Sequence, residues 1–370
     1  MMLPASRMGQ VRKSLLRTYA EKAPNGAINL GLGQLEFPLP ESVRQAGIRA
    51  LQDGHTRYSP NAGFAELRQL VAENCNAERG TDFTAGNVII NCGAEEALFA
   101  ALFALVDQGD KAVILEPAYP AYAPILQALG AQVNMVRMAE AGIDFTRLES
   151  AARDAKAVIL NFPNNPTGAI LPKKQAAELA ALAERHGFAV ISDEVYSALY
   201  YEERNFSPAI GTDQAIIIDG ISKRASAAGL RLGWTIAPLS IARQLEAAHQ
   251  YLTTCASSVS QAAAMAALAD KRHEQAFRHA LQQRRDAMWD EFRHWQVGRA
   301  AKPGGAFYFF PDLSELGSGT ELADQALANG VSVIPGEAFG NAGNGHLRLS
   351  FTAAPEEIRE GMRRIAEAIL

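Results

Sequence analysis

Short apolar runs, several of them rich in β-branched residues, alternate with amphipathic segments through the middle of the chain. The apolar runs occupy residues 88–90, 112–115, 157–160, 189–191 and 216–218. Because they are apolar on both faces, they have the pattern of strands buried on both sides of a sheet. Helical periodicity separates several of them, at residues 95–106, 122–129 and 174–186. The alternation predicts an α/β fold whose mostly parallel sheet lies between layers of helices.

The pattern changes after about residue 240, where long helical stretches follow one another. One of these is Ala-rich, at residues 261–269, and two later runs, 306–310 and 346–351, read as strands. We therefore expect a large domain over residues 46–275. A smaller, discontinuous α+β domain is expected to combine residues 1–45 and 276–370.

The basic N-terminal stretch from Arg7 to Arg17 has two interpretations. A basic N-terminus is typical of a transit peptide. However, Val11, Leu15 and Tyr19 recur at helical spacing, which favours a short amphipathic helix of the folded protein. With this interpretation the expected compartment is the cytoplasm.

Composition excludes several classes of function. The chain has 370 residues, is 48% hydrophobic and carries a formal net charge of −5, which argues against a nucleic-acid partner bound through its phosphates. No apolar run is long enough to span a membrane. Cys75, Cys92 and Cys255 are far apart, and neither they nor the seven histidines have metal-ligand spacing. We expect reduced thiols, no metal and no membrane.

Candidate chemistry follows the predicted strands at the points where they end. Gly93, Glu116, Asn161, Asp193 and Gly220 each lie at or just after the end of an apolar run. Ligands of open parallel sheets bind beyond the carboxyl ends of the strands. These positions are therefore expected to converge on one edge of the sheet.

The turn at residues 91–96 joins a strand to a helix through Gly93. The backbone N–H groups of Ala94 and Glu95 can hold a phosphate at such a helix start, although an ordinary strand-to-helix turn has the same sequence. The chain contains no P-loop and no GxGxxG, so nucleotide binding has little support.

Three further segments offer groups for a flat, anionic cofactor. Asp193 can pair with a protonated heteroaromatic nitrogen, or it can cap a helix, and Tyr196 follows one turn later. Asn165, held between prolines, can donate to a phenolate-type oxygen, whereas a purely structural turn would not need it. Tyr119 can stack on a ring or pack in the core.

Lys223, Ser222 and Arg231 lie close together in the sequence, and Arg348 stands in a later strand-like stretch. A lysine is solvated by default, but neighbouring positive charge can depress its pKa so that it forms an imine and carries a proton. The planar fork of Arg348 suits a carboxylate, although a surface arginine has the same pattern. His346 is interpreted as structural.

Taken together, these segments resemble the fold-type I enzymes that use pyridoxal 5′-phosphate (PLP), specifically the class I/II aminotransferase family. The resemblance runs from residues 29–33 to residues 348–351, with the motifs in family order. It implies a large domain with a mostly parallel sheet, a smaller α+β domain, PLP as cofactor, and transamination between an amino acid and a 2-oxo acid.

The resemblance also assigns roles around the cofactor ring. Lys223 resembles the lysine that forms the aldimine and moves the proton, and Asp193 resembles the partner of the pyridine nitrogen. Asn165 and Tyr196 resemble the donors to the 3-oxygen, and Tyr119 resembles the stacking ring.

The phosphate cup has a counterpart in the backbone of Ala94 and Glu95 together with Ser222 and Arg231. Tyr58 resembles a tyrosine that reaches a phosphate in the partner subunit, which implies a homodimer with shared sites. On the substrate side, Arg348 resembles the clamp for the α-carboxylate.

Gly33 lies in the segment that resembles the mobile cover of the substrate.

Two positions depart from the family pattern. Gly220 replaces a serine found in many relatives, and Glu95 places a carboxylate where a small or polar residue is frequent.

Substrate preference is read from residues 252–260, which lack the arginine that dicarboxylate specialists can place there. We expect neutral or hydrophobic amino donors. The alternatives are a cationic donor attracted by Glu95, or a PLP-dependent lyase that carries out β-elimination or cyclisation. A PLP-sensing regulator needs a basic DNA-binding module, for which the sequence offers no candidate.

Overall fold

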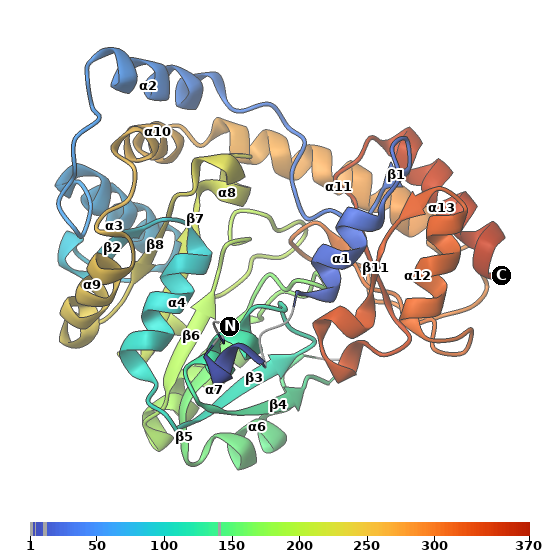
Figure 1. The fold of residues 1–370 in the computed structure, drawn as a ribbon, viewed down its shortest axis with the longest axis horizontal. Coiled ribbons are helices and arrows are strands. Elements are labelled where there is room, and N and C mark those ends of the chain that lie inside the picture. The colour runs from blue at the N-terminus through green and yellow to red at the C-terminus, as the bar shows by residue number, and fades with distance from the viewer. Residues whose placement is uncertain (1–2, 4, 10–12, 140–141) are drawn as a thin grey trace.

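A computed structural model describes residues 3, 5–9, 13–139 and 142–370, and a seven-stranded sheet forms its centre. The strand order is β2-β8-β7-β6-β5-β3-β4 (Figure 1). The strands span Val88–Asn91 (β2), Lys111–Glu116 (β3), Gln132–Arg137 (β4), Ala155–Asn161 (β5), Ala189–Asp193 (β6), Ala215–Gly220 (β7) and Gly233–Ile236 (β8). All neighbouring pairs are parallel except those that β8 makes with β2 and β7.

Helices cover both faces of this sheet because successive strand residues point to opposite sides. One face packs on α3 (Ala65–Arg79), α6 (Phe145–Ala152), α7 (Lys173–His186) and α10 (Ser258–Ala269). The other face packs on α4 (Ala94–Leu105), α5 (Tyr122–Ala128) and α9 (Leu239–Thr253). On β5, Val158 joins the first core and Ile159 the second. The predicted α/β architecture is confirmed.

A separate hydrophobic core lies beside the sheet. It is formed by α1 (Leu15–Lys22), α11 (Arg272–Phe292), α12 (Gly319–Ala328) and α13 (Pro355–Ile369) with short strands between them. These strands are β1 (Ile28–Asn29), β9 (Tyr308–Phe309), β10 (Val331–Ser332), β11 (Ile334–Pro335) and β12 (Leu347–Ser350). Figure 1 shows α11 reaching from the neighbourhood of α10 to α13. The domain boundaries at residues 46 and 276 stay a prediction.

Two further α-helices and six short 3₁₀ turns complete the described path of the chain. Helix α2 (Glu41–Gln52) packs on α10, and α8 is a single turn, Ile221–Arg224. Short 3₁₀ turns lie at Ser6–Gly9, Ala85–Asn87, Pro208–Ile210, Ala228–Leu230, Gly336–Phe339 and Asn341–Gly343.

All five apolar runs lie within strands, but β4 and β8 were not predicted. Strand β4 lies at an edge and its inner positions alternate between exposed and partly buried, so its apolar content is low. Strand β8 has four residues, too few for a period to stand out. Of the expected run 306–310, only Tyr308–Phe309 pairs as a strand.

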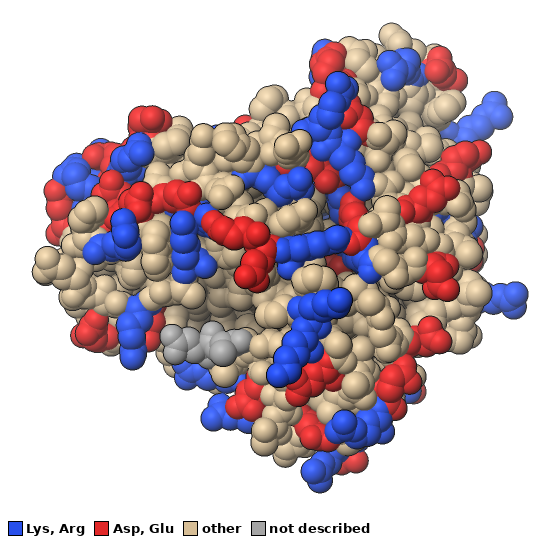
Figure 2. All heavy atoms as spheres, turned by 180° about the vertical axis from the view of Figure 1, so that it is seen from behind, with Lys and Arg blue, Asp and Glu red and all other residues tan. Residues whose placement is uncertain are grey.

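The expected N-terminal helix is present as α1, which begins at Leu15, and Val11 lies outside the described residues. Within residues 3, 5–9, 13–139 and 142–370, no helix has the length and apolar character to cross a membrane. Figure 2 shows basic and acidic side chains interspersed over the rear face, in keeping with the small net charge.

Candidate active site

The carboxyl ends of the central strands bring polar side chains to one edge of the sheet. Asn161 ends β5 and Asp193 ends the adjacent β6. The side-chain amide of Asn161 donates to the backbone carbonyl of Asp193 at 2.9 Å, and the N–H of Phe162 donates to the same oxygen at 3.2 Å. These bonds join the ends of the two strands, so the position of Asp193 is determined by the sheet.

Asp193 is buried and held by two donors. The hydroxyl of Tyr122 donates to Oδ2 at 2.6 Å, and the N–H of Val195 donates to Oδ1 at 3.3 Å. Burial raises the pKa of Asp193 to about 6, and the two hydrogen bonds oppose that rise. Tyr122 was not predicted as a site residue. Its spacing of three residues from Tyr119 was the sequence signal that could have indicated a place near the same site.

Lys223 lies on α8 with its amine inside the site. Nζ donates to the carbonyl oxygen of Gly33 at 2.5 Å and lies 5.5 Å from the centre of the Phe307 ring. Burial, together with the positive charges of Arg348 and Arg231, lowers the pKa of Lys223 to about 8. Roughly a tenth of the amine is then neutral at pH 7, far more than for an ordinary lysine, and the neutral form is what a nucleophile or base requires.

Tyr196, just after β6, and Tyr308, on β9, form a buried pair within the core beside the sheet. Their hydroxyl groups are 2.9 Å apart, and burial raises the pKa of both phenols above the usual range. A Cβ atom at Gly33 would collide with the Tyr308 hydroxyl, so only glycine allows the N-terminal segment to pass this closely. Tyr308 was not predicted as a site residue, because its partner is 112 residues away in the sequence.

Arg348 is buried on β12 and contacts both the N-terminal segment and the turn after β5. Nη1 donates to Oδ1 of Asn165 at 3.1 Å, and Nη2 donates to the carbonyl of Gly31 at 2.5 Å. The guanidinium lies 4.5 Å from the Tyr308 ring centre. Nε is buried without a hydrogen-bond partner among the described residues. An unpaired buried donor is costly, which marks it as a place for an anionic ligand.

The predicted phosphate cradle lies at the start of α4. Gly93 precedes this twelve-residue helix with φ 93°, and the first N–H groups of a helix have no partner inside it. Nη2 of Arg231 lies 2.7 Å from the place a Gly93 Cβ would occupy. Ser222 is half-buried on α8, the turn that also carries Lys223. The predicted cradle residues thus come from neighbouring elements.

The glycine at position 220 has a steric explanation. Gly220 pairs with Gly233 across β7 and β8, and a Cβ at position 220 would lie 2.8 Å from the carbonyl of Leu232. A Cβ on Gly233 would lie 2.7 Å from the Ala94 nitrogen. The two glycines let β8 approach the start of α4, and a serine does not fit at position 220.

Glu95 is exposed in the first turn of α4, with no ion pair to a described residue. Tyr119 lies near Glu95. Burial raises the pKa of the Tyr119 phenol, and the negative charge of Glu95 is the second-largest cause of the same rise. Tyr119 meets Tyr122 edge to face, with ring centres 5.6 Å apart.

Tyr58 is 87% exposed and stands apart from the other candidates in the single chain. Its predicted role concerns a partner subunit and stays a prediction.

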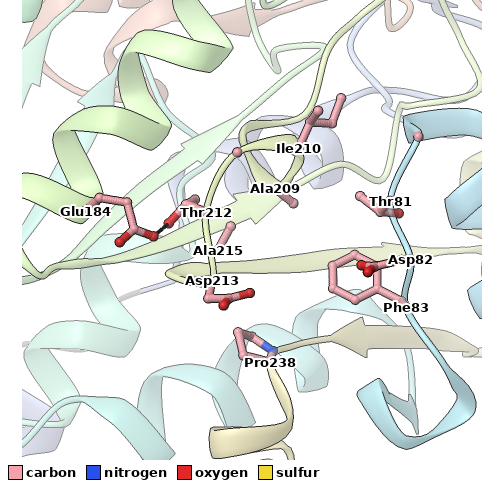
Figure 3. A pocket seen from close by; sticks show the side chains of 12 residues that line it. Thr81, Asp82, Phe83, Glu184, Ala209, Ile210, Thr212, Asp213, Ala215 and Pro238 are labelled. Atoms are coloured by element: carbon pink, nitrogen blue, oxygen red, sulfur yellow. Dashed lines mark hydrogen bonds between the residues drawn. The ribbon is translucent and has the colours of Figure 1, made fainter.

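A cavity of about 610 Å³ lies at the other end of the sheet. Figure 3 shows Phe83, Asp213 and Pro238 around it, and Thr212 hydrogen-bonded to Glu184. It contains no predicted site residue. Across the described residues, no group of three or more His, Cys, Asp or Glu side chains is arranged to hold a metal ion.

A doubly covered, mostly parallel sheet with a smaller core beside it is the architecture of the fold-type I enzymes. The sequence model described as aminotransferase class I and II matches residues 25–365. The chain belongs to this family and is an aminotransferase.

Known proteins across this family are similar over nearly the whole chain. A "Probable aspartate aminotransferase" of Methanocaldococcus jannaschii is 33% identical, over 98% of this chain and 99% of the relative. A "Probable N-acetyl-LL-diaminopimelate aminotransferase" of Bacillus subtilis is 35% identical, over 93% and 89%. The solved aspartate aminotransferase of Thermus thermophilus with maleate superposes with a TM-score of 0.95 at 31% identity, and both chains are covered completely. Relatives with different substrates are thus similarly close.

Proposed function

We propose that this aminotransferase binds PLP at the carboxyl edge of the sheet and transfers the amino group of a neutral or hydrophobic L-amino acid to a 2-oxo acid. The family as a whole depends on PLP. The observation that carries the proposal is the buried amine of Lys223, whose pKa is lowered to about 8 beside Arg348, Arg231 and Asp193. A buried amine, a buried carboxylate and an unpaired arginine nitrogen fit the needs of this cofactor and its substrate.

The phosphate of the cofactor would be held at the start of α4. The backbone N–H groups of Ala94 and Glu95, the hydroxyl of Ser222 and the guanidinium of Arg231 are the donors for it. Tyr58, 87% exposed, would donate to the phosphate in the partner subunit of a homodimer. The proposed compartment is the cytoplasm.

The ring of the cofactor would be held by side chains from four segments. Asp193 would pair with the pyridine nitrogen, and Tyr119 would stack on the ring face. Asn165 and Tyr196 would donate to the ring oxygen. Bound in this way, PLP supplies an electron sink for the negative charge that develops at the substrate Cα.

Lys223 would carry the proton of the reaction. Its neutral amine would take a proton from the substrate Cα and hold it as an ammonium group for delivery to the cofactor. Arg348 would hold the substrate carboxylate, exchanging its present bond to Gly31 for two bonds to the carboxylate. Gly33 lies directly over the amine and excludes water when substrate is bound.

The preference for neutral or hydrophobic donors rests on two observations. Residues 252–260 contain no arginine that could reach a distal carboxylate in a partner subunit. The site is lined by aromatic rings, including those of Phe307, Tyr308 and Phe339 around Lys223 and Arg348. We expect kcat/KM for leucine and phenylalanine to exceed that for aspartate. An aspartate preference contradicts the proposal, and pyruvate and ammonia formed without an added 2-oxo acid would identify a lyase.

A cationic amino donor is the second candidate, favoured by the exposed Glu95 beside Tyr119. An exposed carboxylate near the site attracts a positively charged side chain. In that case E95Q lowers kcat/KM for arginine about tenfold while leucine is unaffected. E178Q, at an exposed position on α7, is the matched control.

A further inference from the structure

Arg224, the residue after Lys223, has a side chain only 3% exposed in a cluster of charged groups. Nη1 donates to Glu274 at 2.7 Å and to Glu78 at 3.1 Å. Nη2 donates to the hydroxyl of Ser197 at 3.0 Å and to Asp219 at 3.2 Å. Four elements or turns thus converge on a single guanidinium. Only the fork of an arginine can make these bonds together.

Arg79 completes the cluster from the end of α3. Its Nε donates to Glu194 at 2.8 Å, and its Nη2 donates to Asp219 at 3.2 Å. Asp219 therefore contacts both arginines and also accepts a hydrogen bond from Ser197 at 2.8 Å. Burial of so many charges is tolerated because each has a partner, whereas removing one partner leaves an uncompensated charge.

The cluster touches the chain immediately beside both principal residues of the proposed site. Glu194 follows Asp193, and Arg224 follows Lys223 on α8. A helix of one turn has almost no internal hydrogen bonding, so its orientation depends on tertiary contacts. The bonds of Arg224 to Glu78 on α3 and Glu274 on α11 supply such contacts.

We propose that Arg224 is a positioning residue that orients the one-turn helix carrying Lys223 and balances the carboxylates behind Asp193. The proposal rests on the roles proposed above for Lys223 and Asp193. A purely structural arginine would affect only folding stability. Arg224 acts in addition on the geometry and protonation of the amine beside it.

The charged groups that face Lys223 are Arg348, Arg231 and Asp193. Asp219 and Glu194 in turn raise the pKa of Asp193. Without Arg224, Asp219 loses one of its two cationic partners, and the net charge behind the site becomes more negative. More negative charge favours protonated forms, so the nitrogen carried by Lys223 should titrate at a higher pH.

The test compares R224M, R224K and R285M in the holoenzyme. Arg285 is a matched control because it is also a buried, paired arginine, and it lies further along α11. Its partners, Glu202 and Asp286, do not belong to the Arg224 cluster. Three quantities are measured for each variant: the midpoint pH of the visible band of the bound cofactor, kcat with KM, and the unfolding midpoint of the apoprotein.

In R224M we expect a higher spectral midpoint and a kcat lower by about ten- to a hundredfold, with KM changed much less. R224K should recover part of both. R285M should lower the unfolding midpoint but keep the wild-type spectral midpoint and kcat.

Wild-type spectra and kcat in folded R224M would overturn the proposal, as would equal changes in R285M. If R224M does not fold, R224K compared with R285K decides in the same way. A wild-type protein that shows no visible band with PLP would instead refute the cofactor assignment, and with it the positioning role.

Discussion

The phenol of Tyr122 donates a 2.6 Å hydrogen bond to the carboxylate of Asp193, and both groups are buried. Burial alone pushes the pKa of Asp193 upward, and this hydrogen bond is the largest opposing contribution. Tyr122 therefore helps to keep Asp193 ionised, which a partner of a protonated pyridine nitrogen must be. The bond crosses from α5 to β6 and makes Tyr122 part of the proposed cofactor site.

Replacing Tyr122 with phenylalanine should raise the pKa of Asp193 above its value of about 6. We expect the cofactor to bind about tenfold more weakly, and the acid limb of the kcat/KM profile to move to higher pH, because loss of a charge-assisted hydrogen bond destabilises the carboxylate. Equilibrium dialysis and a pH profile measure both effects. Y201F, which removes another hydrogen-bonded, partly buried phenol hydroxyl, is the control. An unchanged acid limb in Y122F contradicts the role.

Asp193 should also make the stability of the apoprotein depend on pH. Its pKa is about 6 in the folded chain and 3.8 as the reference value, so the native state holds more protons between about pH 4 and 6. Stability should then fall as the pH rises through this window, by up to about 3 kcal/mol. D193N, which does not titrate, should lack this fall. Denaturant unfolding at pH 4, 5, 6 and 7 measures it, and identical slopes in both proteins would refute the assignment.

Replacing Lys223 with alanine should abolish turnover and the visible band of the bound cofactor, because it removes the amine proposed to form the imine and carry the proton. K111A, at an exposed lysine paired with Asp154, should retain both. Steady-state assays and absorption spectra provide the measurements. Residual turnover and a visible band in K223A would rule out the assignment.

Introducing serine at position 220, the residue that the family resemblance leads us to expect there, should not improve cofactor binding. A Cβ at position 220 would lie 2.8 Å from the Leu232 carbonyl, so β8 must shift. We expect G220S to lower the free energy of unfolding by about 1–3 kcal/mol and to weaken PLP binding. G229S, where an added Cβ meets no atom within 4 Å, is the control. Tighter PLP binding by G220S would contradict the steric explanation.

Removing the hydroxyl of Tyr58 should weaken PLP binding about tenfold without changing the stability of the subunit, since the side chain makes its proposed bond in the partner. Y251F, at another tyrosine that is 87% exposed, is the control. Hybrid dimers of Y58F and K223A subunits should regain one complete site and recover activity at limiting cofactor. Equal affinities of Y58F and the wild type would exclude a shared site.

Much of the fold could be predicted because its signals are local. The runs at residues 88–90 and 157–160 are apolar on both faces, and this pattern already requires a sheet covered on both sides. Parallel strands end at the same edge of a sheet. The order of strands and turns in the sequence was therefore enough to predict that Asn161 and Asp193 lie close together. Strand β4 was missed because an edge strand buries too little to need an apolar run.

What the sequence determined by itself was the fold class, the family, and the side chains available at one edge of the sheet, because periodicity and turn chemistry act over a few residues. Only the tertiary structure decided the contacts of these side chains, such as Tyr122 with Asp193, Tyr196 with Tyr308, and Arg348 with Gly31, 317 residues away. It also decided the pKa values, since burial is the largest cause for both Lys223 and Asp193. Burial is a property of the packed chain, and no local pattern contains it.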